Sequence, residues 1–146
     1  MDKDTNSLVL EYEIMQNDFT RAGEASSNVK KVLTQLGIDS KTIRRVAIAT
    51  YEAEMNIVIH SYGGKIIVTI FPEEIEILAL DIGPGIKNID LAMKEGYSTA
   101  PNRVRELGFG AGMGLPNMKK CSDVFKISSS EGKETEVFMK IYVKHN

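Results

Sequence analysis

Three polar residues, Glu52, Asn56 and His60, recur at intervals of four, and apolar residues such as Met55 and Ile57 flank them. Each step of four advances about 40° around a helix, so the three side chains share one stripe of a predicted helix. A carboxylate there can act as a general base or orient a water, and an amide oxygen suits a hard cation such as Mg²⁺. The alternative is structural: Glu52 and Asn56 bond each other or a helix end, and His60 caps the helix or donates at the edge of the core.

A second candidate group surrounds Asp81, which continues the side of a predicted strand that Ile77 and Ala79 occupy. On that core-facing side a carboxylate costs free energy unless it accepts hydrogen bonds, and the exocyclic amine of adenine is one donor that fits. Gly83 and Gly85 follow at once and allow the backbone to approach a flat ring. The alternative is an ordinary tight turn that Asp81 caps.

Glycines recur at every second position ahead of a further predicted helix: Gly108, Gly110, Gly112 and Gly114. Successive glycine amides can form an anion-binding nest, and the N-terminus of a helix that opens near Pro116 adds partial positive charge. Arg103 and Arg105 lie just upstream, where a guanidinium could neutralise a terminal phosphate during transfer. The segment therefore favours polyphosphate binding, and the alternative is a flexible linker with two solvated arginines.

Hydrophobic periodicity predicts the elements that position these groups. We expect strands at 8–14, 65–71, 75–81, 124–128 and 135–143, helices at 18–36, at 39–60 and from about 116, and a short helical patch near 91–93. Gly37 is suited to end the first helix, and Asp39 or Ser40 to cap the second. This order lacks the strict alternation of a doubly wound sheet, so it predicts an α+β fold: a two-layer sandwich whose mixed sheet carries its helices on one face.

Composition narrows the class of protein. The 146 residues suit one domain, and a formal net charge of −2 argues against direct nucleic-acid binding, which needs an excess of Lys and Arg. The single cysteine excludes an internal disulfide and fits a reducing compartment. The sequence shows neither a secretion signal nor a membrane-spanning run, so we expect a cytoplasmic protein without a membrane partner.

Together these motifs resemble the ATP-binding fold, also called Bergerat-type, that is shared by DNA gyrase, heat-shock chaperones, histidine kinases and mismatch-repair ATPases. They most resemble the small bacterial serine kinases that act as anti-sigma factors or as switch kinases in stress signalling. Residues 52–60 are similar to the first sequence box of that family, residues 81–86 to the second and residues 110–115 to the third. The likeness covers residues 8–143, which implies a single histidine-kinase-like ATPase domain over residues 1–146.

The resemblance implies a role for each motif. Glu52 would be the catalytic base or orienter, Asn56 would coordinate Mg²⁺, and Asp81 would bind the adenine amine. Residues 98–114 would form a lid over ATP and bring Arg105, a second catalytic residue, near the γ-phosphate. The residues expected to contact the nucleotide are Asn56, His60, Asp81, Gly83, Gly85, Ile86, Ser98, Thr99, Gly108, Gly110, Gly112, Met113, Gly114, Leu115 and Thr135. Thr135 resembles the last box of the family, but Glu134 stands where the family has glycine.

Two functions from different classes follow from the resemblance. The first is an ATP- and Mg²⁺-dependent serine/threonine protein kinase that regulates a sigma-factor or stress-signalling pathway by phosphorylating an anti-sigma-factor antagonist. The alternative is an ATP-binding anti-sigma module that sequesters a sigma factor without catalysis. The resemblance is also compatible with a homodimer that pairs through the first strand and helix. A histidine kinase would need an upstream phosphoacceptor helix, and the chain offers only His60 and His145.

Overall fold

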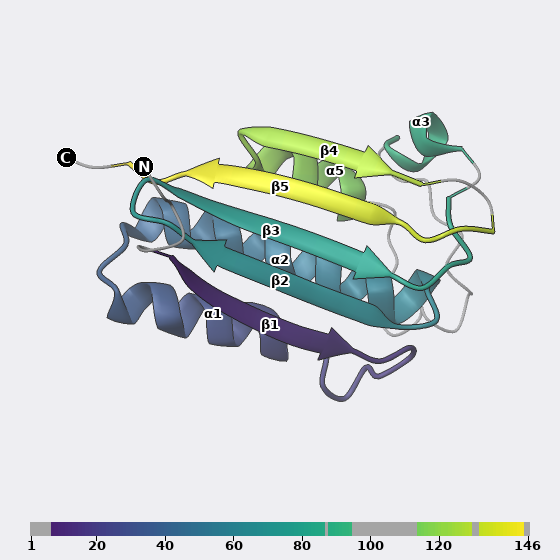
Figure 1. The fold of residues 1–146 in the computed structure, drawn as a ribbon, viewed down its shortest axis with the longest axis horizontal. Helices are drawn as coiled ribbons and strands as arrows, with labels where there is room; N and C mark the ends of the chain where they lie inside the picture. The colour runs from purple at the N-terminus through teal and green to yellow at the C-terminus, as the bar shows by residue number, and fades with distance from the viewer. Residues whose placement is uncertain (1–6, 87, 95–113, 130–131, 145–146) are drawn as a thin grey trace.

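The computed structural model describes residues 7–86, 88–94, 114–129 and 132–144. Five strands form one sheet in the order β1-β2-β3-β5-β4, and the long helices cover one face of it (Figure 1). The two-layer α+β arrangement is confirmed. The sheet is antiparallel at every described pairing rather than mixed. The reason is the connectivity: β2–β3 and β4–β5 are adjacent antiparallel pairs formed by consecutive strands, so these connections need no parallel crossover.

The strands lie within one residue of where the alternating pattern predicted them. Their bounds are β1 Leu8–Ile14, β2 Gly64–Ile70, β3 Glu74–Asp81, β4 Val124–Ser128 and β5 Glu136–Tyr142. Every second side chain of the central strands faces the helices and is almost fully buried, among them Ile66, Val68, Ile75, Ile77, Met139 and Ile141. Because burial alternates strictly, the register of these strands is well determined by their sequence.

The helices are α1 Glu24–Gln35, α2 Ser40–His60, α3 Ile89–Ala92 and α5 Gly114–Cys121. As predicted, Gly37 takes a positive φ of 74° after α1, and Asp39 caps α2 by accepting from Thr42 N–H at 3.0 Å. The expected start of the first helix at Asp18 is wrong. Asn17 at φ 59° and Gly23 at φ 98° adopt left-handed backbone conformations, which delay the helix until Glu24. Among the described residues, no helix is long and apolar enough to cross a membrane.

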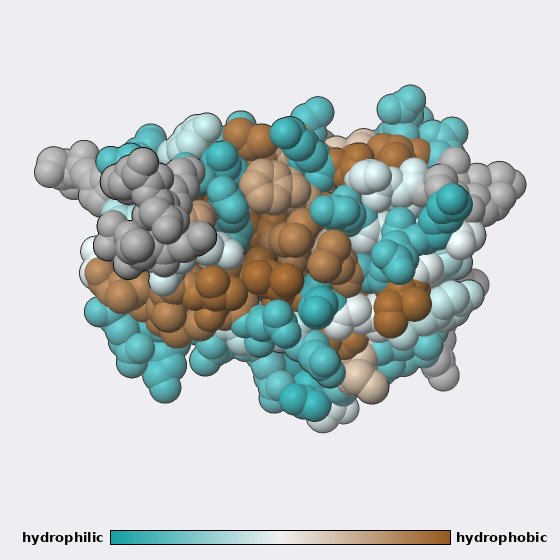
Figure 2. Space-filling view, viewed as in Figure 1, coloured by the Kyte–Doolittle hydropathy of each residue, from teal (hydrophilic) through white to brown (hydrophobic). Residues whose placement is uncertain are grey.

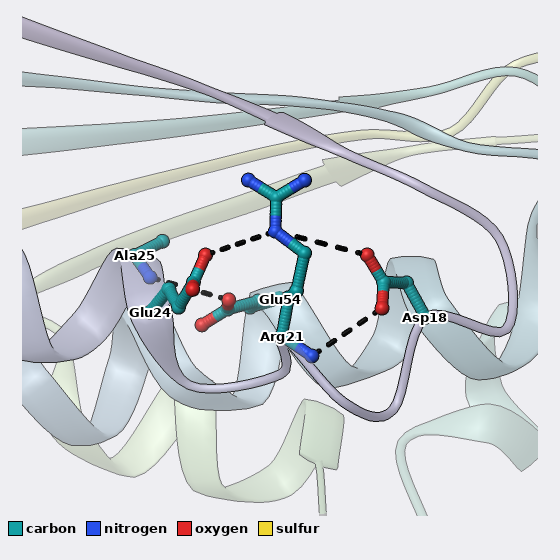
Figure 3. Close-up of polar contacts among 5 residues, drawn as sticks. All are labelled: Asp18, Arg21, Glu24, Ala25 and Glu54. Atoms are coloured by element: carbon teal, nitrogen blue, oxygen red, sulfur yellow. Dashed lines mark hydrogen bonds and ion pairs between the residues drawn. The ribbon is translucent and has the colours of Figure 1, made fainter.

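The start of α1 is capped by a carboxylate from another helix. Gly23, at the N-cap, has no side chain that could accept from the free N–H groups of the first turn. Glu54 of α2 supplies the acceptor: Oε2 lies 3.2 Å from Ala25 N and Oε1 lies 3.5 Å from Ser26 N. On the outer side, Arg21 donates to Glu24 at 3.1 Å (Figure 3). Glu54, only 2% exposed, therefore joins α1 to α2.

Burial raises the pKa of Glu54, and the nearby Glu24 charge adds to the rise, whereas the α1 N–H groups oppose it. A raised folded-state pKa means that the folded protein binds this proton more tightly than the unfolded chain. The free-energy cost of the ionised carboxylate is therefore relieved as the pH falls through the raised pKa. We therefore expect the wild type to gain stability relative to Glu54→Gln as the solution is acidified. The difference in unfolding free energy, wild type minus variant, should increase as the pH falls from about 7.5 to about 5. Urea denaturation at each pH measures it.

The matched control for this titration is Glu73→Gln, at an exposed position in the turn before β3. At neutral pH its unfolding free energy should stay within about 0.5 kcal/mol of the wild type, because exposed substitutions away from caps and packed contacts usually cost little. A difference for Glu54→Gln that stays flat, or that falls as the solution is acidified, would contradict the assignment of Glu54 as a desolvated cap.

Gly64, the first residue of β2, pairs with Asp81 at the end of β3. A Cβ at this position would overlap the Leu80 carbonyl oxygen and lie 2.8 Å from Asp81 Cα. Both are backbone atoms that cannot rotate away, so Gly64→Ala should lower the unfolding free energy by about 2 kcal/mol in urea titrations. Gly132→Ala is the control, because no described atom beyond its chain neighbours lies within 4 Å of the added Cβ, so that only the backbone strain at φ 79° remains. Equal costs at the two glycines would contradict the steric argument.

The face of the sheet that is turned away from the helices carries apolar side chains in neighbouring strands. Ile67, Leu78 and Phe138 are partly exposed and stand in one row, because Ile67 pairs with Leu78 and Leu78 with Phe138. Val9 of β1 is 57% exposed. In the space-filling view a hydrophobic area extends across this face (Figure 2). We call Val9, Ile67, Leu78 and Phe138 the open-face patch.

Candidate functional site

A small recess lies where α2, α5 and the adjoining ends of β3 and β5 meet. It is lined by Ala53, Asn56, Ile57, Ala79, Asp81, Met118, Thr135 and Val137. Most of these side chains are apolar and buried, so the polar groups converge from Asn56, Asp81 and Thr135. As the described residues form it, the recess has a volume of about 10 Å³, which is room for roughly one water molecule. Three residues that the sequence singled out separately therefore share one recess.

Asp81 is held in the recess by Thr135. Thr135 N–H donates to Asp81 Oδ1 at 2.8 Å, and Asp81 N–H donates to the Thr135 carbonyl at 3.0 Å. Oδ2 accepts no hydrogen bond from the described part of the chain. Burial raises the pKa of Asp81, the Thr135 bond opposes the rise, and the Glu134 charge adds to it. One carboxylate oxygen is thus fixed while the other is available to a donor such as an amine.

Asn56 has the properties expected of a ligand-binding amide. Its side chain is partly exposed, lines the recess and forms no hydrogen bond with any described residue. The described residues contain no group of three or more His, Cys, Asp or Glu side chains arranged to hold a metal ion. A magnesium ion at Asn56 would complete its coordination with waters and oxygens of a bound phosphate, which is the usual way that Mg²⁺ is held beside nucleotides.

Thr135 belongs to a chain of hydrogen bonds that the sequence did not reveal. Its side chain is 3% exposed, and its hydroxyl lies 2.6 Å from the Ser129 hydroxyl. Ser129 in turn accepts from Ile86 N–H at 2.8 Å. The register of β4 against β5 is what could have indicated this contact. Ser128 pairs with Glu136, so the next residue, Ser129, lies opposite Thr135. Glu134, in place of glycine, does not prevent Thr135 from facing the recess.

The turn after β3 contains the glycines that the sequence marked. Gly83 and Gly85 have positive φ values of 35° and 82°. The turn is anchored by Tyr62, whose N–H lies 3.2 Å from the Ile82 carbonyl and 3.3 Å from the Gly83 carbonyl. Ile86, two residues past Pro84, is half-buried. The turn therefore begins directly after Asp81, the last residue of β3.

Glu52 lies beside the start of α5 and does not line the recess. Asn117 Nδ2 donates to Glu52 Oε2 at 2.6 Å, so Glu52 does not bond Asn56 as the structural alternative supposed. Oε1 lies 3.9 Å from the position that a Cβ on Gly114 would occupy. Leu115, the next residue, is 6% exposed and packs in the core. Sequence reasoning missed Asn117, since nothing in its spacing relates it to Glu52.

The remaining predicted residues are either peripheral or lie outside the described chain. His60 is the last residue of α2 and is not among the lining residues of the recess, and burial lowers its pKa. Outside the described residues lie Ser98, Thr99, Arg105, Gly108, Gly110, Gly112 and Met113, with the rest of the expected lid except Gly114, which opens α5. Their roles stay predictions.

Comparison with known sequences gives consistent matches over most of the chain. A family profile described as a histidine kinase-like ATPase domain matches residues 15–141. The anti-sigma F factor of Clostridium acetobutylicum is 33% identical over 121 residues, which cover 80% of this chain and 81% of that protein. The serine/threonine-protein kinase RsbT of Bacillus subtilis is 31% identical over 124 residues, covering 82% and 85%.

The fold has a counterpart among solved structures. The crystal structure of the RsbU and RsbW domains of Rv1364c from Mycobacterium tuberculosis superposes with a TM-score of 0.63. The match covers 95% of this chain at 14% identity, so it supports the fold alone. This chain spans about a third of the mycobacterial one, because the match covers 33% of it.

Proposed function

We propose, from the premise that this chain belongs to the histidine kinase-like ATPase domain family, that it is an ATP-dependent serine/threonine protein kinase. Its substrate would be an anti-sigma-factor antagonist, so that the chain regulates a sigma factor. The similarity to an anti-sigma F factor and to the kinase RsbT supports this assignment. The observation that carries it is the recess. There the Asp81 carboxylate, bonded through Oδ1 alone, meets the Asn56 amide, which bonds no described side chain, and Glu52 lies on the same helix as Asn56.

Each residue then has a task in the transfer. Asp81 Oδ2 accepts from the exocyclic amine of adenine, while Oδ1 stays on Thr135 N–H. Asn56 would hold a magnesium ion through its amide oxygen, where the ion would offset phosphate charge. Glu52 takes the proton of the acceptor hydroxyl as the hydroxyl oxygen bonds the γ-phosphorus. The bond between the γ-phosphorus and the β,γ-bridging oxygen breaks at the same time, and ADP leaves with the electron pair.

Labelled ATP tests this function directly. The chain is incubated with Mg²⁺, γ-labelled ATP and a panel of purified anti-sigma-factor antagonists from the organisms of its relatives. Transfer of label to a serine or threonine of one antagonist supports the kinase, and phosphoamino-acid analysis identifies the acceptor. Binding of ADP, measured in parallel by calorimetry, separates a chain that binds nucleotide without transfer from one that does not bind nucleotide. No label on any member of the panel would count against the kinase.

The second candidate is an ATP-binding module that sequesters a sigma factor without catalysis. The open-face patch supports it, because apolar side chains on a sheet face that none of the described helices covers suit a protein partner. Glu52→Ala separates the two candidates. A pure binder with this substitution would still inhibit transcription by its sigma factor and would still be released by the antagonist. If the chain is a kinase, the antagonist would still release the sigma factor from the Glu52→Ala variant. The variant could not reverse that release, because it could not phosphorylate the antagonist.

A further inference from the structure

Asn117 and Glu52 meet across two helices although 65 positions separate them in the sequence. The distance of 2.6 Å from Asn117 Nδ2 to Glu52 Oε2 is at the short end for such a bond, as expected when the acceptor is a charged carboxylate. A carboxylate accepts only, so the nitrogen of the amide must be the atom that faces Glu52. The contact is partly buried, which protects it from competition by water.

The surrounding packing fixes where Asn117 can point. Its neighbours Pro116 and Met118 are buried, and Met118 is fully so, which sets the rotation of α5 about its axis. The far end of α5 is tied to α2 by Arg45, whose Nε donates to the Cys121 carbonyl at 3.1 Å. Arg45 also lies 3.1 Å from Asp123. The packing of its neighbours and the Arg45 contact therefore fix the backbone of Asn117. Only the rotamer of its short side chain is left for the bond to Glu52 to fix.

We propose that Asn117 is a positioning residue that orients the Glu52 carboxylate for proton transfer. By holding Oε2 it leaves Oε1, the oxygen beside Gly114, as the one that meets the acceptor hydroxyl. The inference rests on the proposed function, since it gives Glu52 its orientation in that reaction. Asn117 itself touches neither nucleotide nor acceptor in this assignment, so its effect must appear in turnover and not in nucleotide binding.

Three substitutions at this position test the role. Asn117→Leu has a similar volume and no donor, and should lower kcat about 10-fold while leaving KM for ATP and the Kd of ADP within about twofold. Asn117→Asp has the same shape but faces Glu52 with a second carboxylate, so the loss should exceed that of Asn117→Leu. Asn117→Gln keeps a donor amide and should recover part of the rate. Lys119→Ala, an exposed substitution on the same helix, is the control and should leave kcat unchanged.

A second measurement examines the contact without any enzymatic step. The side-chain amide resonance of Asn117 in a ¹⁵N-labelled protein is assigned by its absence from the Asn117→Leu spectrum. Glu52→Gln should shift this resonance, whereas Glu73→Gln should not. An unshifted resonance would overturn the proposal, because the hydrogen bond would then be missing in solution.

The outcomes separate the proposal from the function on which it rests. If the wild type transfers phosphate and Asn117→Leu does so at the same kcat, the positioning role is overturned while the kinase stands. A matching loss in kcat and in ADP affinity would also overturn it, since that pattern indicates a merely structural residue. If the wild type transfers no phosphate to any acceptor, the proposed function itself fails, and the positioning role fails with it whatever the amide resonance shows.

Discussion

Glu52→Gln is expected to slow phosphoryl transfer by about 10³-fold while the Kd of ADP changes by less than about twofold. The substitution keeps the shape of the side chain, and its remaining oxygen can still accept from Asn117 Nδ2. What it removes is the ability to take the proton of the acceptor hydroxyl. Glu52 does not line the recess that holds Asp81 and Asn56, so nucleotide affinity should be retained. Single-turnover transfer to a labelled antagonist and calorimetry with ADP measure the two quantities.

Glu73→Gln is the matched control, because it makes the same chemical change at an exposed turn before β3, at the opposite end of that strand from Asp81. It should transfer phosphate at the wild-type rate. If Glu52→Gln also did so, Glu52 would be no base, and the structural interpretation, in which it merely joins α2 to α5 through Asn117, would replace the catalytic one.

Asp81→Asn should weaken ATP binding about 100-fold, or about 2.7 kcal/mol. Thr135 N–H requires an acceptor at the position of Oδ1, so an asparagine must place its oxygen there and turn its NH₂ group into the recess. That group would face the adenine amine, donor against donor. Guanine carries a carbonyl at the same ring position, so the ratio of ATP to GTP affinity should fall as well. Calorimetry with both nucleotides and Mg²⁺ measures it.

Asp90→Asn, at an exposed position of α3, serves as the control and should leave both affinities unchanged. An unaltered affinity for ATP in Asp81→Asn would show that the adenine amine is recognised elsewhere. A uniform loss for ATP and GTP would instead indicate that the substitution disturbs the Thr135 pairing and the turn at Gly83.

The fold was predictable where the pattern is local. The strands follow a strict alternation of buried and exposed side chains. Asp39 marks the start of α2 through its side-chain cap, and Gly37 marks the end of α1 through its positive φ. The start of α1 was not predictable, because its cap is Glu54 from a helix some thirty residues later in the chain. When the capping side chain comes from a distant part of the sequence, the residues around the helix start contain no signal for it.

The same distinction applies to the site. Asn56, Asp81 and Thr135 were identified because each sits in a recognisable motif, and the fold then brings them to one recess. Ser129 could be found only from the register of β4 against β5, and Asn117 only from the packing of α5 on α2. Both depend on how elements lie against each other, which single-sequence periodicity does not contain.

The open-face patch has a practical consequence for measuring this protein. Dyes that brighten in apolar surroundings bind uncovered hydrophobic surface on native proteins as well as on unfolded ones. Such a dye would fluoresce on the native chain through Ile67, Leu78 and Phe138 and give a high baseline before any melting. Stability series on these variants are better followed by circular dichroism, which reports the loss of backbone structure and is blind to the patch.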